Sequence, residues 1–301
     1  MHGIIYIRFR NEDGYMVEVE KLSIFNIDIF RELYDGKDNS YICDKTFFEA
    51  YDNEPFIVKF ILRKQVKLFK LNEKYIGYIW HEYPASKNLP CNIYSLYVKE
   101  EYIDCIKPEF LDSLNIDSFK IDIRDNPKNL ELIKKLNFTL LSETLLMKLD
   151  AYNPMLNINN NLIFEHFKKN KHENLRCELQ NLIFDNKDRI PLSVSDILAE
   201  EEEKYYLDDF CVFIAIDSCT PIGYGQVILN RGKYTIVNLG VIKEHRGMRY
   251  GEELLKYLIN LCICKNISEI YIRVDKNNIP ALRLYTKLGF REYSSYSVWN
   301  S

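Results

Sequence analysis

The sequence predicts an α/β fold, in which helices flank a mixed sheet, and predicts that this fold occurs twice along the chain. In the second half, β-branched and aromatic runs between turn signals lead into a helical stripe, a further strand and a second helix. The first half shows the same order of elements. Short sequences also recur between the halves at a near-constant offset, which is typical of an internal duplication.

The second half has the clearest periodicity. Apolar, β-branched runs predict its strands, and leucines that recur along one helical face predict its helices. The predicted strands are residues 212–215, 222–229, 234–241, 270–274 and 296–299, and the predicted helices are residues 254–262 and 280–288. Pro280 suits the first turn of the last helix, and Gly289 suits its end.

The first half predicts strands at residues 66–71, 75–80, 92–98, 119–123 and 139–149, with a helix at 130–136. Its sequences Ile76-Gly77-Tyr78, Leu96-Tyr97-Val98 and Leu136-Asn137-Phe138 are echoed in the same order by Ile222-Gly223-Tyr224, Leu239-Gly240-Val241 and Leu288-Gly289-Phe290. We therefore expect two domains, residues 1–150 and 155–301, joined at the Pro-bearing stretch 151–154.

Composition narrows the functional class. The chain has 301 residues, a net charge of −4 and a pI near 5.9, which argues against a nucleic-acid partner. No apolar run approaches the roughly 18 residues that span a bilayer, and the N-terminus has no signal-peptide pattern. We expect a cytoplasmic protein that has no membrane partner.

Eight cysteines are present, most of them within apolar runs, and no CxxC pair occurs. Cys262 and Cys264 form a CxC, but neither a second pair nor a nearby histidine completes a zinc site. We interpret the cysteines as small apolar side chains and expect no metal.

One stretch carries a chemical signal. Residues 241–255 run from a predicted strand through a glycine-bearing loop into an amphipathic helix. The first turn of a helix leaves N–H groups unpaired, and its dipole favours an anion. A strand, such a loop and a helix N-terminus together form a diphosphate site. Neither a Walker sequence nor a GxGxxG sequence is present.

Here the chain resembles the GCN5-related N-acetyltransferase superfamily. That family has an Arg/Gln-x-x-Gly-x-Gly/Ala loop after its fourth strand. The loop Arg246-Gly247-Met248-Arg249-Tyr250-Gly251 matches at its first and last positions, but Arg249 replaces the glycine at the fourth. Either the backbone still fits the phosphate, or the guanidinium adds a contact of its own. A second family segment, Asn-x-x-Ala-x-x-Leu-Tyr-x-x-x-Gly-Phe, is closely matched by residues 277–290.

The resemblance implies acetyl-CoA as cofactor and an amine, on a small molecule or a peptide, as acceptor. By position, Leu239 supplies the backbone N–H that polarises the thioester, and Tyr285 donates a proton to the departing sulfur. The implied cofactor-binding set is Leu239, Val241, Arg246, Gly247, Met248, Arg249, Tyr250, Gly251, Glu252 and Asn277.

The general base is not evident. Some relatives place a glutamate in the fourth strand, where this chain has Thr235. An acidic cluster, residues 200–203 with Asp208 and Asp209, precedes the strand at 212. It is either a rim that attracts a cationic amine or a solvated helix face.

The first half lacks the residues that the resemblance assigns to cofactor binding and catalysis. Residues 99–108 contain no glycine and carry Glu100, Glu101 and Asp104, which would repel a pyrophosphate. Ile133 occupies the position that echoes Tyr285. We therefore expect a degenerate first copy that has no cofactor loop.

Three functions fit the sequence. The first is an N-acetyltransferase with one working site, in the second half. The second is a non-catalytic acyl-CoA-binding or regulatory protein, favoured by Arg249 and by the missing strand carboxylate and opposed by Tyr285. The third is an aminoacyl-tRNA-dependent transferase, which the acidic pI opposes. Protein N-termini, lysines, polyamines, aminoglycosides and small amines are all possible acceptors.

Overall fold

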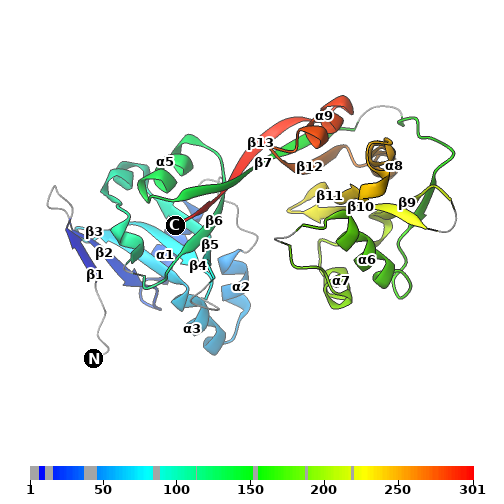
Figure 1. Cartoon of the computed structure of the whole chain (residues 1–301). Helices are drawn as coiled ribbons and strands as arrows, with labels where there is room; N and C mark the ends of the chain where they lie inside the picture. Colours follow the sequence, from blue (N-terminus) through cyan, green and yellow to red (C-terminus); the bar gives the residue numbers. More distant parts are fainter. Residues whose placement is uncertain are drawn as a thin grey trace. The chain divides into compact units, whose positions relative to one another are not determined.

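A computed structural model describes residues 7–10, 16–36, 46–83, 89–112, 114–151, 155–186, 189–217 and 220–301. The chain forms two compact units, coloured from blue to red along the sequence in Figure 1. Unit 1 comprises residues 1–143 and 294–301, and unit 2 comprises residues 144–293. Cys43, Cys219 and residues 152–154 of the expected joint lie outside the described residues.

Unit 1 is built on a mixed sheet in the order β1-β2-β3-β4-β5-β6-β13, in which β5 and β6 are parallel. Its strands are β1 (Ile7–Arg10), β2 (Met16–Lys21), β3 (Val66–Leu71), β4 (Lys74–His81), β5 (Cys91–Val98), β6 (Phe119–Arg124) and β13 (Arg291–Asn300). Its helices are α1 (Ile27–Asp35), α2 (Phe47–Asn53), α3 (Phe56–Lys64), the 3-10 turn η1 (Glu100–Cys105), α4 (Glu109–Asp112) and α5 (Pro127–Lys135). The sequence-based expectations for this half covered β3 to β7 and α5.

Unit 2 has a mixed sheet in the order β7-β12-β11-β10-β9-β8. Its strands are β7 (Thr139–Asp150), β8 (Ile163–His166), β9 (Cys211–Ala215), β10 (Pro221–Asn230), β11 (Lys233–Val241) and β12 (Glu269–Asp275). Its helical segments are α6 (Glu173–Ile183), α7 (Val194–Glu201), η2 (Asp208–Phe210), η3 (Lys243–His245), α8 (Tyr250–Cys264) and α9 (Ile279–Lys287). The strands and helices predicted for the second half of the sequence are all present, and the last of these strands is β13 of unit 1.

The two halves of the sequence exchange their last strands. Residues 144–150 of β7 follow the first half in sequence but pair with β12 of unit 2. Residues 296–300 of β13 follow the second half but pair with β6 of unit 1. The compact units therefore differ from the expected ranges 1–150 and 155–301, because each sheet is completed by a strand from the other half.

Hydrogen bonds repeat between the units, as a duplication predicts. Gly77 is opposite Val98 in unit 1, and Gly223 is opposite Val241 in unit 2. The residue after each of these valines donates its N–H to the residue that precedes the opposite glycine. Lys99 N donates to Ile76 O at 2.8 Å, and Ile242 N donates to Ile222 O at 2.9 Å.

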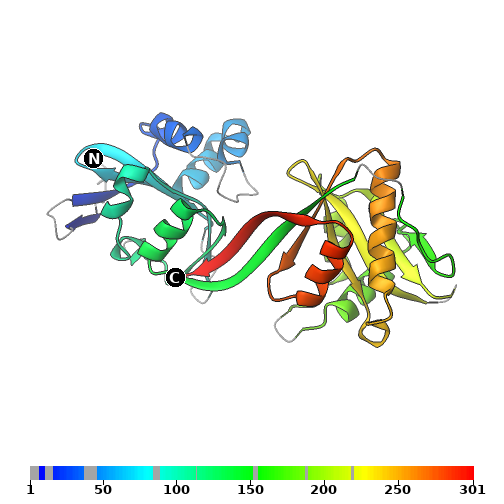
Figure 2. The ribbon, with the colours of Figure 1, turned by 90° about the horizontal axis from the view of Figure 1, so that it is seen from above.

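Helices cover both faces of the unit 2 sheet. In Figure 2, α8 (orange) and α9 lie in front of the strands, and the green helices α6 and α7 lie behind them. Leu254, Leu255 and Leu258 of α8 are fully buried in the front core. Leu179 and Ile183 of α6 are buried in the core behind. No helix in the described part of the chain is long and apolar enough to cross a membrane.

Candidate functional site

Strands β11 and β12 of unit 2 separate to form a wedge. Their parallel pairing covers only Tyr234–Ile236 against Ile270–Ile272, and neither strand has a further partner on that side in the described residues. Peptide groups of a strand that lacks a neighbour are free to bind a ligand. The wedge is therefore a place where an extended molecule can bind along the second half of β11.

A bulge interrupts β11 beside this wedge. Between the pairs Tyr224–Gly240 and Gln226–Val237, β10 has one residue and β11 has two, Asn238 and Leu239. Asn238 adopts a left-handed backbone, with φ of 52°. A bulge leaves its extra residue unpaired and re-aims the local peptide groups. Leu239, the predicted source of the polarising N–H, thus has no partner in the pairing with β10 or β12.

The loop after β11 ends in a left-handed residue at its irregular position. Arg249 has φ of 67° and is the N-cap of α8, and Gly247 has φ of 81°. Glycine adopts such angles freely, whereas another residue pays about 1–2 kcal/mol. The backbone at Arg249 therefore keeps the conformation that the family's glycine favours, and the departure from the pattern is in the side chain.

The start of α8 offers a row of free donors. None of the five N–H groups from Gly247 to Gly251 has a hydrogen-bond acceptor among the described residues. The Arg249 side chain is exposed and has no partner there either. Because α8 adds the positive end of its dipole, this loop has the donors and the charge that a diphosphate requires.

Two predicted loop residues are otherwise engaged. The Arg246 guanidinium donates to Val241 O at 3.1 Å and to Ile183 O at 2.6 Å, so it ties the loop to β11 and α6. Glu252 donates its N–H to Arg249 O, and Lys287 binds its carboxylate at 2.7 Å. This hydrogen bond lowers the pKa of Glu252. The Arg246 guanidinium keeps further N–H donors beyond these two contacts, whereas the Glu252 carboxylate is paired and its N–H is engaged.

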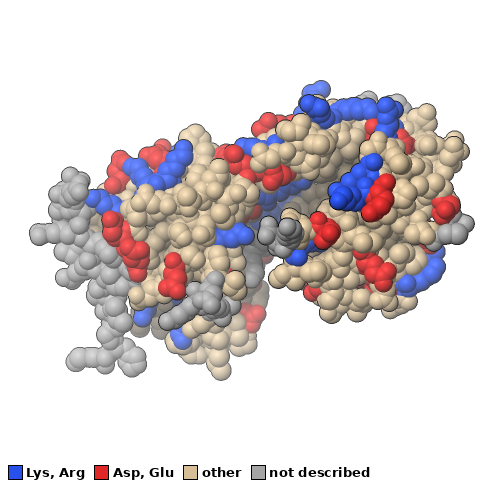
Figure 3. Space-filling model, viewed as in Figure 1, with Lys and Arg blue, Asp and Glu red and all other residues tan. Residues whose placement is uncertain are grey.

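Basic side chains lie near the same region. Figure 3 shows Lys and Arg side chains gathered along the edge of unit 2 that carries α9 in Figure 1. A basic surface of this kind attracts an anionic ligand and raises its rate of association.

Tyr285 is buried on α9 with its ring against the core. It is 8% exposed, and its ring centroid lies 6.0 Å from that of Phe290. Burial raises the pKa of the phenol to about 12. Burial alone accounts for this shift, and no hydrogen bond of the hydroxyl contributes to it. The phenol is therefore protonated near neutral pH and available as a donor.

Asn277 lies in the turn between β12 and α9. Its N–H donates to Asp275 Oδ1 at 2.7 Å, and its side chain is exposed. The cap of α9 is the next residue, Asn278, whose Oδ1 accepts from Ala281 N. Capping therefore does not account for Asn277, whose amide is free to contact a ligand.

Comparisons with known proteins agree with this geometry. The model of the acetyltransferase (GNAT) family matches residues 179–290. A solved GCN5-related N-acetyltransferase from Sphaerobacter thermophilus has a TM-score of 0.62 at 16% identity, over 84% of this chain and 88% of that chain. A tandem GNAT protein from the clavulanic acid biosynthesis pathway has a TM-score of 0.56 at 10% identity, over 99% of this chain and 98% of that one.

Residues 179–290, within unit 2, therefore match the acetyltransferase (GNAT) family, and the solved structures share the fold of the chain. The family and the fold class predicted from the sequence are thus confirmed, including the tandem arrangement. An uncharacterized N-acetyltransferase of Methanocaldococcus jannaschii is 32% identical over 83 residues, which are 27% of this chain. The match covers 53% of that relative's length.

No carboxylate is found in β11 at the position where some superfamily members place a base. Thr235 is buried there, and its hydroxyl donates to Lys233 O at 3.0 Å. The acidic cluster is paired in part. Asp208 lies 3.1 Å from Lys169, and Asp209 lies 2.8 Å from Lys265. Glu202 and Glu203 are exposed.

The structure reveals polar residues that the sequence analysis missed. Arg176 of α6 is fully buried and donates to the Glu200 carboxylate, which also accepts from Gln226 Nε2 at 2.7 Å. Tyr224 Oη donates to Gln226 Oε1 at 2.5 Å. These side chains lie on the sheet face beneath α6 and α7. The offset that relates the two halves could have revealed them, because Arg176 and Gln226 replace Phe30 and Trp80.

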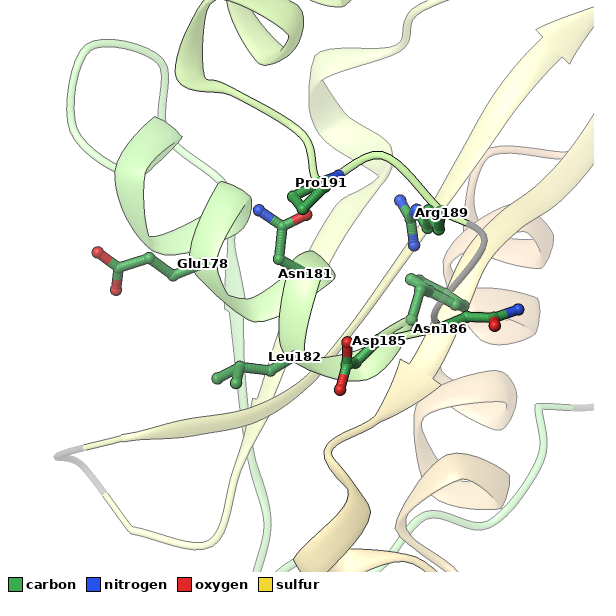
Figure 4. A pocket seen from close by; sticks show the side chains of 8 residues that line it. Glu178, Asn181, Leu182, Asp185, Asn186, Arg189 and Pro191 are labelled. Atoms are coloured by element: carbon green, nitrogen blue, oxygen red, sulfur yellow. The ribbon is translucent and has the colours of Figure 1, made fainter.

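A pocket of about 450 Å³ lies at the end of α6 (Figure 4). Glu178, Asn181 and Leu182 line it from the helix, and Asp185 and Arg189 line it from the segment that follows. These helix positions alternate with the sheet-facing ones, so the pocket lies on the other face of α6 from Arg176. The candidate site does not include it.

Proposed function

We propose that unit 2 transfers an acetyl group from acetyl-CoA to an amine. The observation that carries this proposal is the loop Arg246–Gly251. Its five free N–H groups lead into α8, and the strand that precedes the loop is both bulged and splayed. A nucleotide loop would supply the donors but would not require the bulge at Leu239.

The residues present fit the proposed cofactor. The N–H groups of residues 247–251 and the free guanidinium of Arg249 would hold its pyrophosphate. Val241, at the open edge of β11, would lie along the pantetheine arm, and the Asn277 amide would contact the cofactor from the other side of the wedge. Acetyl-CoA would supply the activated thioester.

Two groups then carry the proposed chemistry. The N–H of Leu239, freed by the bulge, would stabilise negative charge on the carbonyl oxygen as the amine attacks. The phenol of Tyr285 would donate its proton toward the sulfur as the C–S bond breaks. With its pKa raised to about 12, Tyr285 keeps this proton until charge develops beside it.

One observation favours a different function, a non-catalytic acyl-CoA-binding protein. Thr235 is buried and supplies no base to deprotonate the amine. The two functions differ in turnover, because a binding protein would hold CoA tightly and release no thiol.

A thiol-release assay with acetyl-CoA and a panel of amines tests the proposal. We expect turnover with at least one amine and its loss in Tyr285→Phe, with CoA affinity retained. Tight CoA binding without thiol release on any amine would instead support the binding protein.

A further inference from the structure

The sheet face beneath α6 and α7 in unit 2 has a direct counterpart beneath α1 and α2 in unit 1. Tyr224 and Tyr78 occupy equivalent positions, because they follow Gly223 and Gly77 in the repeated ladder. The same offset of 146 residues relates Gln226 to Trp80 and Arg176 to Phe30. Ring contacts agree with this equivalence. Phe30 lies 5.0 Å from Tyr78, and the Arg176 guanidinium lies 5.3 Å from the Tyr224 ring.

In unit 1 this face is filled by aromatic side chains. Phe30, Tyr78 and Trp80 are buried, with exposures of 0%, 0% and 3%. Phe47 packs edge-on against Phe30 at 5.0 Å and against Trp80 at 5.2 Å. The fold thus closes this face with apolar packing, and a charge is not needed to build it.

In unit 2 the same positions hold a polar network. Arg176 is 0% exposed and donates through Nη2 to Glu200, while its Nε and Nη1 have no partner among the described residues. Gln180 Nε2 and Tyr206 Oη are also buried and unpaired there. Buried charges and unpaired polar groups destabilise a fold relative to apolar packing. Stability therefore does not explain this network.

Glu200 is the member of the network that reaches the surface. It lies in the last turn of α7, and its side chain is 21% exposed. Its partner Gln226 is opposite Val237, two residues before Leu239. Opposite residues of antiparallel strands share a face, and two strand residues span about 7 Å. The carboxylate is therefore close to the bulge, on the face that α8 leaves free.

We propose that Glu200 binds the acceptor as an alkylammonium ion, which releases a proton to solvent before the neutral amine attacks the thioester. Each of its oxygens accepts one hydrogen bond from a buried donor, Gln226 or Arg176, which fixes the carboxylate and leaves lone pairs for a ligand. The carbonyl end of α7 adds negative potential at the same place. Arg176 and Gln226 act as positioning residues. This inference rests on the proposed acetyl transfer and specifies its acceptor class.

The test compares Glu200→Gln with Glu203→Gln in the full chain. Glu203 is exposed at the same end of α7, so its substitution makes the same charge change outside the network. Thiol release is measured with 1,4-diaminobutane and tyramine, which are charged alkylamines at neutral pH, and with aniline, which is neutral. We expect Glu200→Gln to raise KM about 10–100-fold for the alkylamines that the wild type accepts. The KM for aniline and the affinity for CoA stay unchanged.

Equal KM values for Glu200→Gln and Glu203→Gln would overturn the inference, as would an equal rise for aniline. Absence of turnover in the wild type with every amine would overturn the proposed function instead, so the two failures are distinguishable. If Glu200→Gln does not fold, Gln226→Leu serves as the second variant, because it frees one carboxylate oxygen and keeps the charge. It should raise KM for alkylamines by a smaller factor, and an unchanged KM would again contradict the inference.

Discussion

In unit 1, β4 and β5 pair without interruption from Gly77 to Trp80, whereas in unit 2 the equivalent strands are interrupted at Asn238 and Leu239. Both units splay the next strand pair after three residues, as Cys91–Ile93 against Phe119–Ile121 shows for unit 1. The wedge therefore belongs to the shared framework. The register shift of unit 1 lies further along, between Trp80 and His81, so a bulge at the position of Asn238 and Leu239 is particular to unit 2.

The segments that follow β5 in unit 1 and β11 in unit 2 also differ. In unit 1, the 3-10 turn Glu100–Cys105 and the four-residue helix α4 follow β5. In unit 2, a glycine-bearing loop leads into the fifteen-residue helix α8. A pocket of about 390 Å³ remains beside residues 97–103 in unit 1, and the ion pair between Lys128 and Glu100 lies in its wall. It has acidic side chains where unit 2 has free N–H groups, so we predict that unit 1 binds no CoA.

The last helices carry the third difference. Phe138 N donates to Ile133 O at 3.2 Å, and Phe290 N donates to Tyr285 O at 3.0 Å. Asn137 and Gly289, just before these phenylalanines, both have positive φ. The backbone is thus the same, and a buried isoleucine suffices for packing in unit 1. Packing at this position therefore does not require the hydroxyl of Tyr285.

Replacing Tyr285 should have the largest effect. In Tyr285→Phe we expect kcat to fall about 10²–10⁴-fold, because the departing sulfur loses its proton donor. The Kd for CoA, measured by calorimetry, should stay constant. Because the pKa of Tyr285 is about 12, the phenol does not ionise as pH rises toward about 10, so wild-type kcat should not fall there on its account.

The matched control is Tyr293→Phe, which removes a hydroxyl from a 44% exposed tyrosine. Its kcat should equal that of the wild type. Similar kcat values for the two variants would remove Tyr285 from the mechanism.

Deleting Asn238 should remove the bulge between the pairs Tyr224–Gly240 and Gln226–Val237 of unit 2. Leu239 would then pair opposite Gly225, and its N–H would no longer be free. We expect kcat to fall about 10²–10³-fold, the usual cost of losing an oxyanion donor. Steady-state thiol release measures the loss, and CoA affinity should change little.

Asn238→Gly is the control for this deletion, because glycine keeps both the bulge and the positive φ of 52°. Full activity in the deletion variant would show that the bulge does not supply the N–H.

Arg249→Asn separates backbone from side chain at the irregular loop position. Asparagine tolerates the left-handed conformation, so folding should be retained. Loss of a charge-assisted contact worth about 1.5–3 kcal/mol should raise the Kd for CoA about 10–100-fold. Arg291→Asn, at another exposed arginine of the same half, should leave Kd unchanged. Equal Kd values for both variants would mean that only the backbone of Arg249 holds the phosphate.

The smallest effect is expected for Gly247→Ala. Both Gly247 and Gly232 have positive φ, 81° and 73°, and a Cβ on either would meet no atom within 4 Å. Alanine should therefore lower the unfolding free energy by about 1–2 kcal/mol at each position, measured by denaturant titration. Only Gly247→Ala should also weaken CoA binding. The same loss of affinity in Gly232→Ala would indicate a global effect of strain.

The hydrophobic pattern of the sequence predicted well where the strands and helices lie. Period-2 and period-3.6 runs placed the strands and helices, because burial of one face fixes those periods. The motif around Arg246 could be located because a phosphate loop requires particular residues in a particular order. The echo between Leu136-Asn137-Phe138 and Leu288-Gly289-Phe290 corresponds to a shared left-handed turn.

Other features depend on tertiary pairing and could not be predicted from local pattern. The exchange of β7 and β13 leaves the alternation of each strand unchanged, so no local signal shows which sheet it joins. The bulge at Asn238 is one added residue in an otherwise regular strand. The guanidinium of Arg246 was expected at the phosphate, yet it binds two carbonyls, because its direction depends on how α6 packs against β11.

The central claim is that the chain has one cofactor site and that this site is in unit 2. Isothermal titration of the full chain with CoA tests it most directly, using the wild type and Arg249→Asn. We predict a stoichiometry of one CoA per wild-type chain. The variant should bind the same number of CoA molecules with a higher Kd. A stoichiometry of two CoA per chain would contradict the claim. So would a single CoA that contacts residues 99–108 and that the variant binds with the wild-type Kd.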